Sequence, residues 1–281
     1  MTGVQTCALP ICGVLHPVDM KPCQVTFEAD THTYRINGTK VPSVTQILKH
    51  LKNPFDSQRI AGFVAKKQGK SVESVLKEWN DKSAAALLKG KALHSAAEDT
   101  MLDRRKVDSD ASEVNSWLRF WNASKQFLSP RMVEEIIADS EYMVAGTVDA
   151  VLFSSKTNKN HVFDWKTGKF MTASPYGNML LHPFNDLPEC QYSIYSLQVS
   201  IYRLMLERQG KEMGGSWIVH CDEQAKPWPA LDLRERLDAC RHSLRVLGNA
   251  VHLLAHLGKT FRPSDRKSTR LNSSHIPLSR M

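Results

Sequence analysis

The sequence of 281 residues lacks closely spaced cysteines, long apolar runs and internal repeats. Its six cysteines are scattered, and none forms the Cys-x-x-Cys spacing that zinc and iron–sulfur sites use. We therefore expect reduced, mostly buried thiols, as in cytosolic proteins. Charged or polar residues interrupt every apolar run before the roughly 18 residues that a membrane span needs, which excludes a membrane channel.

Positive charge is in modest excess. The chain carries 37 Lys+Arg against 29 Asp+Glu, a net charge of +8, and 42% of its residues are hydrophobic. This composition is typical of a globular protein with a substantial core. Residues 266–281 hold four basic residues and no acidic one, so the rest of the chain has 33 − 29 = +4. Such a charge is weak support for a nucleic-acid partner, because phosphate contacts need basic residues concentrated at one site.

Both ends of the chain resemble conceptual translations of sequencing-adaptor DNA. The two segments are TGVQTCALPI near the start and RKSTRLNSSHIPLSRM at the end. We expect residues 1–12 to be a non-native leader and 266–281 a non-native basic tail, leaving 13–265 as a single domain. A lipoprotein signal ending at Cys12 is disfavoured, because the leader has no basic region and places bulky Ile11 before the cysteine. An authentic basic tail that binds nucleic acid stays open as an alternative.

The apolar pattern predicts a small sheet, then helices, then a larger sheet. Alternating segments between residues 24 and 41 predict a small antiparallel sheet, and Ser43 is the expected N-cap of the helix that follows. Strands connected by a crossing helix predict an α/β fold with a mixed central β-sheet flanked by helices and a helical N-terminal region. The expected helices are 56–67, 71–80, 82–102, 110–128, 189–209 and 231–257, and the expected strands of the larger sheet are 132–138, 142–153, 162–166 and 216–221.

Charged residues interrupt two of these apolar strands. Asp164 and Lys166 lie two residues apart, so they project from the same face, roughly 6.6 Å apart along the backbone, while Trp165 points to the other face. Asp149 lies between Val148 and Ala150 in the preceding strand. A buried charge is costly unless it is paired or used. If the two strands pair, two carboxylates and one ammonium converge at one point.

Two converging carboxylates supply the oxygen ligands that Mg²⁺ and Mn²⁺ prefer. Such a cation would polarise a phosphoryl oxygen and lower the pKa of a bound water, while Lys166 could orient the hydroxide or offset charge on the phosphate. The predicted reaction is hydrolysis of a phosphodiester. The alternative is structural, because Asp-x-Lys is a common pattern that mostly forms surface salt bridges.

Two helical segments carry further candidate residues. Gly90, His94 and Glu98 are spaced four residues apart and share one helix face, so the His94 imidazole would point inward. A lone histidine on an apolar face is more often a hydrogen-bonded core residue than a ligand, and the carboxylates shift the balance towards a ligand. Gln198 and Tyr202 form part of a polar stripe on the helix expected at 189–209, where the simpler interpretation is a helix edge facing solvent.

The motifs GTVD, ending at Asp149, and DWKTG, starting at Asp164, resemble the PD-(D/E)XK nuclease superfamily, in particular its RecB-type exonuclease branch with many phage members. The similarity runs from about residue 24 to 206. It implies a restriction-endonuclease-like core. It also implies catalytic roles for Asp149, Asp164 and Lys166, metal binding by His94, Asp149 and Asp164, and nucleic-acid contacts by Gln198 and Tyr202.

The resemblance implies a divalent-metal-dependent DNA nuclease, more often an exonuclease, acting in recombination, repair or phage genome processing. It implies Mg²⁺ or Mn²⁺ as cofactor, DNA as partner and a cytoplasmic location in a bacterium or an infected host. Some relatives carry a four-cysteine iron–sulfur site, but Cys221 and Cys240 are too isolated to belong to one, so we expect no cluster. Two alternatives stay open: an inactive nucleic-acid-binding module of the same fold, and an unrelated protein with a structural ion-pair network.

Overall fold

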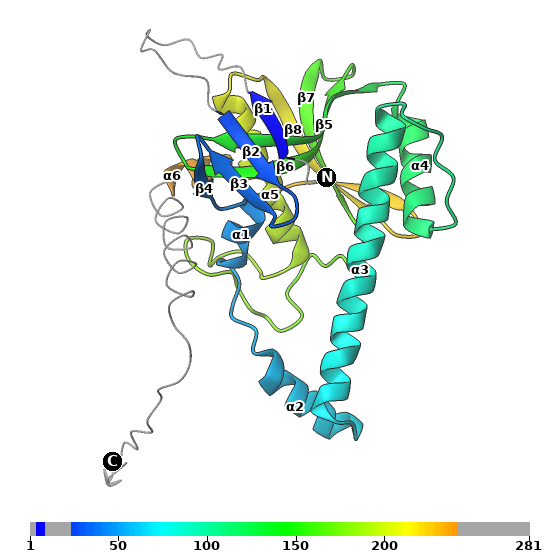
Figure 1. The fold of residues 1–281 in the computed structure, drawn as a ribbon, viewed down its shortest axis with the longest axis vertical. Coiled ribbons are helices and arrows are strands. Elements are labelled where there is room, and N and C mark those ends of the chain that lie inside the picture. The colour runs from blue at the N-terminus through cyan, green and yellow to red at the C-terminus, as the bar shows by residue number, and fades with distance from the viewer. Residues whose placement is uncertain (1–3, 9–23, 241–281) are drawn as a thin grey trace, which may run out of the picture.

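A computed structural model describes residues 4–8 and 24–240, which form a small antiparallel sheet and a larger mixed sheet flanked by helices (Figure 1). The small sheet has the order β1-β2-β3-β4 and the larger sheet the order β5-β6-β7-β8-β9. The predicted α/β fold with a mixed central sheet is confirmed. None of the helices in these two ranges combines the length and the apolarity that a bilayer-spanning helix requires.

The small sheet contains the three strands expected from the sequence and one more. β2 (Gln24–Glu28), β3 (Thr33–Ile36) and β4 (Thr39–Val41) pair in sequence order, and Asn37 and Gly38 make the tight turn with positive φ angles of 49° and 80°. β1 (Val4–Ala8) adds an antiparallel edge strand from the segment expected to be a non-native leader. Backbone pairing at a sheet edge accepts almost any extended segment, so this strand does not bear on the segment's origin.

Helices α1 to α4 follow the small sheet. α1 (Val44–Lys49) begins at the predicted N-cap Ser43, whose side chain accepts a hydrogen bond from the Gln46 backbone in a complete capping box. The helices predicted at 71–80 and 82–102 are one continuous helix, α3 (Val72–Met101), because no residue near position 81 breaks the helix and Lys77 pairs with Asp81 across one turn. The other two are α2 (Ser57–Gln68) and α4 (Ser112–Ser124).

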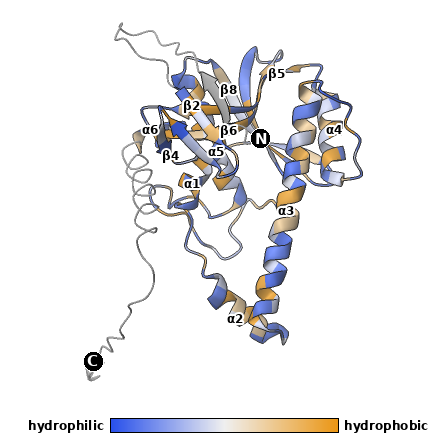
Figure 2. Cartoon of the chain, viewed as in Figure 1, coloured by the Kyte–Doolittle hydropathy of each residue, from blue (hydrophilic) through white to orange (hydrophobic). Residues whose placement is uncertain are grey.

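α2 and the half of α3 that contacts it extend away from both sheets (Figure 1). Figure 2 shows hydrophilic residues over much of this projecting pair. A small cluster of two alanines and a valine holds the two helices together, namely Ala61, Ala65 and Val75, with partly buried residues such as Val72 packed against it. The pair is therefore a thin extension of the body rather than part of the main core.

The central sheet is antiparallel except for one parallel pair, between its third and fourth strands. Its strands are β5 (Leu128–Asp139), β6 (Val144–Ser154), β7 (Lys159–Lys166), β8 (Met213–Cys221) and β9 (Ala225–Pro229). β7 and β8 are parallel, and α5 (Gln191–Arg208) is the crossover between them. β5, β7 and β8 begin earlier than predicted. β9 was not predicted, because its prolines argue against a strand except at a sheet edge.

Two hydrophobic clusters cover opposite faces of this sheet. α1 and α5 pack on one face around Val162, Leu197 and Leu206, and α3 and α4 pack on the other around Trp117 and Trp165. Asp149, Asp164 and Lys166 project from the face that α5 covers. Along β6 and β7 they alternate with residues of the second cluster, which lies on the opposite face. The sheet thus places these three side chains beneath α5.

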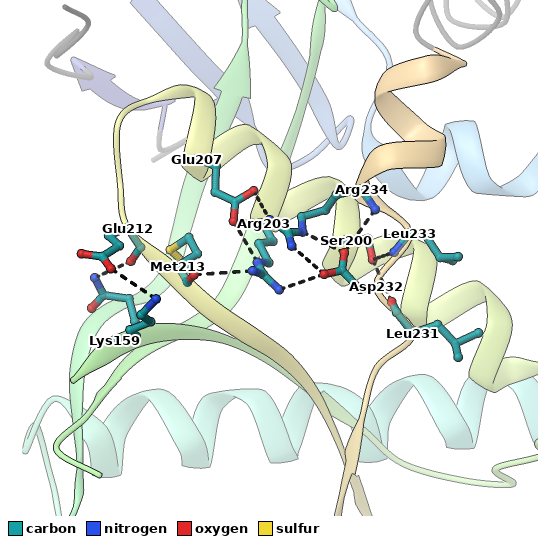
Figure 3. Close-up of polar contacts among 11 residues, drawn as sticks. Lys159, Ser200, Arg203, Glu207, Glu212, Met213, Leu231, Asp232, Leu233 and Arg234 are labelled. Carbon is teal, nitrogen blue, oxygen red and sulfur yellow. Dashed lines mark hydrogen bonds and ion pairs between the residues drawn. The ribbon is translucent and has the colours of Figure 1, made fainter. Parts of the chain in front are cut away.

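An arginine network fixes α5 to the end of the described chain (Figure 3). Arg203 is buried and contacts Glu207 at 3.0 Å and Asp232 at 3.4 Å, and its guanidinium also donates to the Met213 carbonyl of β8. Arg234 binds the same two carboxylates. It begins α6 (Arg234–Ala239), the described part of the helix predicted at 231–257; residues 241–257 lie outside the described ranges.

Candidate metal centre

Pairing of β6 with β7 brings the two predicted carboxylates together. The two strands are antiparallel and Ala150 pairs with Phe163. Asp149, which precedes Ala150, therefore lies opposite Asp164, which follows Phe163. The backbone N–H of Trp165 donates to Asp149 Oδ2 at 2.8 Å, which fixes this carboxylate at the strand junction. The Trp165 side chain points to the other face and packs against Trp117, as the strand alternation predicted. The expected convergence of the two aspartates is therefore present.

His94 reaches this junction from α3. Its Nε2 atom lies 3.8 Å from Asp149 Oδ2, and its Nδ1 atom lies 2.7 Å from Glu134 Oε1. One ligand atom each from His94, Glu134 and Asp149 lies within 4.8 Å of the others. An imidazole nitrogen with two carboxylate oxygens is a donor set that suits a divalent cation such as Mn²⁺ or Mg²⁺. Asp164 lies beside this group but is not a member of it.

Glu134 is the site residue that the sequence analysis missed. It lies on β5 between Val133, which pairs with Ala150, and Glu135, which pairs with Val148, so it faces Asp149. Its φ angle is +50°, a left-handed conformation that costs an ordinary residue free energy and is often found at functional sites. Its signal in the sequence was the adjacent Glu134-Glu135 pair, which breaks the alternation of an otherwise apolar strand.

Asp164 and Lys166 form a buried ion pair with an N–O distance of 2.7 Å. Within the described ranges, neither oxygen of Asp164 has a hydrogen bond of good geometry. Burial raises the pKa of the Asp164 carboxyl, although Lys166 opposes the rise. Burial alone would lower the pKa of Lys166, but the carboxylates of Asp164 and Asp149 outweigh it and raise that pKa. Lys166 is therefore an ammonium at neutral pH, and it lies against a buried carboxyl group that is otherwise poorly hydrogen-bonded within the described ranges.

Burial by itself lowers the pKa of His94, but the carboxylates of Asp149 and Glu134 outweigh it and raise the pKa from 6.5 to about 9. Without a cation, His94 is thus an imidazolium at pH 7. The raised pKa stabilises the fold fully below pH 6.5, and this contribution disappears as the pH rises through 9. A bound cation needs the neutral imidazole, so its binding competes with this proton.

We therefore expect His94→Gln to weaken the pH dependence of stability in the metal-free protein. The wild type loses the stabilisation from the imidazolium between about pH 6.5 and pH 9, whereas glutamine does not titrate. Unfolding midpoints measured in EDTA across this range test the prediction. Parallel curves for the two proteins would show that His94 does not titrate in this window.

Gln198 and Tyr202 lie on α5 behind the two aspartates. Tyr202 is 3% exposed and Gln198 7% exposed, and burial, with Asp149 and Asp164 nearby, raises the pKa of the Tyr202 phenol. The ring fits against Gly146 of β6, where a Cβ atom would lie only 2.9 Å from it. These residues have little surface with which to contact a polynucleotide. The structure thus favours packing behind the site over the nucleic-acid contact predicted for them.

The described cysteines lie away from these ligands. Cys190, Cys221 and Cys240 are free, and the first two are buried. Burial raises the pKa of the Cys221 thiol to about 12, which keeps it protonated and a poor metal ligand. These three cysteines have the features expected of reduced, structural thiols.

The comparisons with known proteins add no relative. No protein-family model matches the sequence, and no curated protein matches it. The site combines a histidine, three carboxyl groups and a lysine whose pKa is raised, where β5, β6 and β7 lie beside α3.

Proposed function

We propose that the protein is a divalent-metal-dependent nuclease that hydrolyses phosphodiester bonds in DNA. The observation that carries the proposal is the convergence of His94, Glu134 and Asp149 within 4.8 Å, next to the Asp164–Lys166 pair. An imidazole and carboxylates suit Mg²⁺ or Mn²⁺, and Lys166 suits an anionic phosphate. The resemblance of the two strand motifs to PD-(D/E)XK nucleases supports the same assignment.

The donor set fits the proposed cation. His94, Glu134 and Asp149 would hold it, and the buried Asp164 carboxyl, which has the Lys166 ammonium but no well-formed hydrogen bond within the described ranges, would gain a second positive partner. When bound, the cation supplies electrostatic stabilisation of the phosphate and lowers the pKa of a water.

Other residues of the site supply a positive charge and position the ligands. Lys166 keeps its proton, because its pKa is raised, so it acts as a positive charge towards the phosphate rather than as a base. The Trp165 backbone N–H holds Asp149 in place, and Glu134 orients the His94 ring through Nδ1. Asp164 orients the Lys166 ammonium through their ion pair.

The function is tested by incubating end-labelled single-stranded and duplex DNA with the protein and Mn²⁺, with an EDTA control. We expect cleavage that requires the cation. DNA binding without cleavage would instead support an inactive binding module. If the protein neither binds nor cleaves DNA, the result would support a structural ion-pair network.

A further inference from the structure

A cavity of about 340 Å³ lies on the far side of Tyr195 from Lys166. Three segments line it: 52–55 after α1, 171–178 in the loop after β7, and 189–195 at the start of α5. Its volume is near the lower end of the range for small-ligand pockets, about 300–1,000 Å³. Tyr195 lines the cavity and also lies beside the Asp164–Lys166 ion pair, with its ring centre 5.1 Å from Lys166 Nζ. A group bound in the cavity would therefore sit one side chain away from the reacting phosphate.

Two exposed aromatic rings line this cavity. Tyr176 is 87% exposed and Phe55 is 69% exposed. Tyr176 makes no ring, ion-pair or hydrogen-bond contact with any other described residue, and Phe55 has only the Trp79 ring beside it, at 5.9 Å. Nucleobases stack on aromatic faces of this kind, and the stacking does not depend on the identity of the base.

The polar side chains that line the cavity are amides and hydroxyls, together with one lysine, Lys52, and one carboxylate, Glu189. Within the part of the chain that the structure describes, the side-chain amides of Asn178 and Gln191 form no hydrogen bond, so both are available to a ligand. Glu189 is already engaged, because Asn53 donates to its carboxylate from both its side chain, at 2.6 Å, and its backbone, at 3.3 Å. Free amides beside aromatic rings suit the edge of a base, and Lys52, which also lines the cavity, suits a phosphate of the same strand.

We propose that this cavity binds one unpaired base of the strand being cut, stacked against Tyr176 and Phe55. The base must be unpaired, because a base inside a duplex is stacked and paired and would have to flip out to enter. The neighbouring phosphate then reaches Lys166 past Tyr195. The inference rests on the proposed nuclease function and assigns the subsite that positions its substrate.

The test compares Tyr176→Ala, Phe55→Ala and the double variant with a matched control, Phe63→Ala. Phe63 is 62% exposed on α2 and does not line the cavity. Two quantities are measured: KM and kcat for Mn²⁺-dependent cleavage of a short single-stranded oligothymidylate, and the quenching of a single 2-aminopurine in that strand. The quenching is measured in EDTA, where the proposed reaction lacks its cation and the strand stays intact.

We expect the double variant to raise KM at least about tenfold with a smaller change in kcat, as loss of base stacking would. The 2-aminopurine quenching should disappear in the double variant and persist in Phe63→Ala and in Tyr176→Phe, which keeps the ring. Wild-type kinetics and quenching in the double variant, with cleavage intact, would overturn the subsite and leave the nuclease function standing. Absence of Mn²⁺-dependent cleavage and of strand binding in the wild type would overturn both.

Discussion

Asp149→Asn is expected to reduce Mn²⁺-dependent DNA cleavage by at least about 10³-fold, equivalent to about 4 kcal/mol of transition-state stabilisation. Asp149 connects α3 with the sheet at the site, because it lies close to His94 and accepts a hydrogen bond from the Trp165 backbone N–H. Asparagine keeps the shape and can still accept that hydrogen bond, but it removes the charge that a cation needs. Initial cleavage rates for the wild type and the variant at saturating Mn²⁺ measure the effect.

The same variant separates a catalytic site from a structural ion-pair network. If the site binds a cation, Asp149→Asn folds normally and loses the rise in unfolding temperature that Mn²⁺ gives the wild type. If the carboxylate instead stabilises the fold, removing one partner of a buried pair costs about 3–5 kcal/mol. Because Asp149 also stabilises the His94 imidazolium, stability is compared in EDTA above about pH 9, where His94 is neutral, and a variant that unfolds far below the wild type there would contradict the catalytic assignment.

Lys166→Ala is expected to reduce cleavage by about 10²–10³-fold, the usual loss for one electrostatic contact with a transition state. In contrast to Asp149→Asn, this variant should retain binding of Mn²⁺, because Lys166 is not among the candidate ligands. Some loss of stability is expected, since Asp164 loses its ion-pair partner. Rates are therefore compared well below the unfolding midpoint of the variant, together with a Mn²⁺ titration.

The pH dependence of the wild type gives an independent check on the role of Lys166. Because its raised pKa keeps the ammonium charged through neutral and moderately alkaline pH, its deprotonation should not appear in the rate profile in that range. A rate that depends on a deprotonated Lys166 near neutral pH would mean that it acts as a base, contrary to the role proposed here.

The sequence predicted the central part of the site because strand alternation is a local property. Asp164 and Lys166 share a face whenever residues 162–166 form a strand, and an apolar strand around Asp149 makes pairing with that strand favourable. The position of His94 was also accessible, since its spacing from Gly90 and Glu98 fixes the helix face on which it lies. These predictions required only the period of each element.

Glu134 and the burial of α5 could not be predicted in the same way. Glu134 enters the site through a positive φ angle in the middle of a strand, a backbone feature that no residue pattern specifies. Gln198 and Tyr202 looked like a polar helix edge, but α5 crosses directly over the sheet and buries both. Which side of a helix meets a sheet depends on tertiary packing, and the close approach of Tyr202 to Gly146 is one of its details.

The most direct test of the cation site is a crystal structure determined after soaking with MnCl₂, with diffraction data collected near the manganese absorption edge. The account predicts an anomalous difference peak within coordination distance of His94, Glu134 and Asp149 in the wild type, and no such peak in Asp149→Asn. A wild-type map with no peak there at saturating Mn²⁺, while His94 and Glu134 stay hydrogen-bonded to each other, would contradict it.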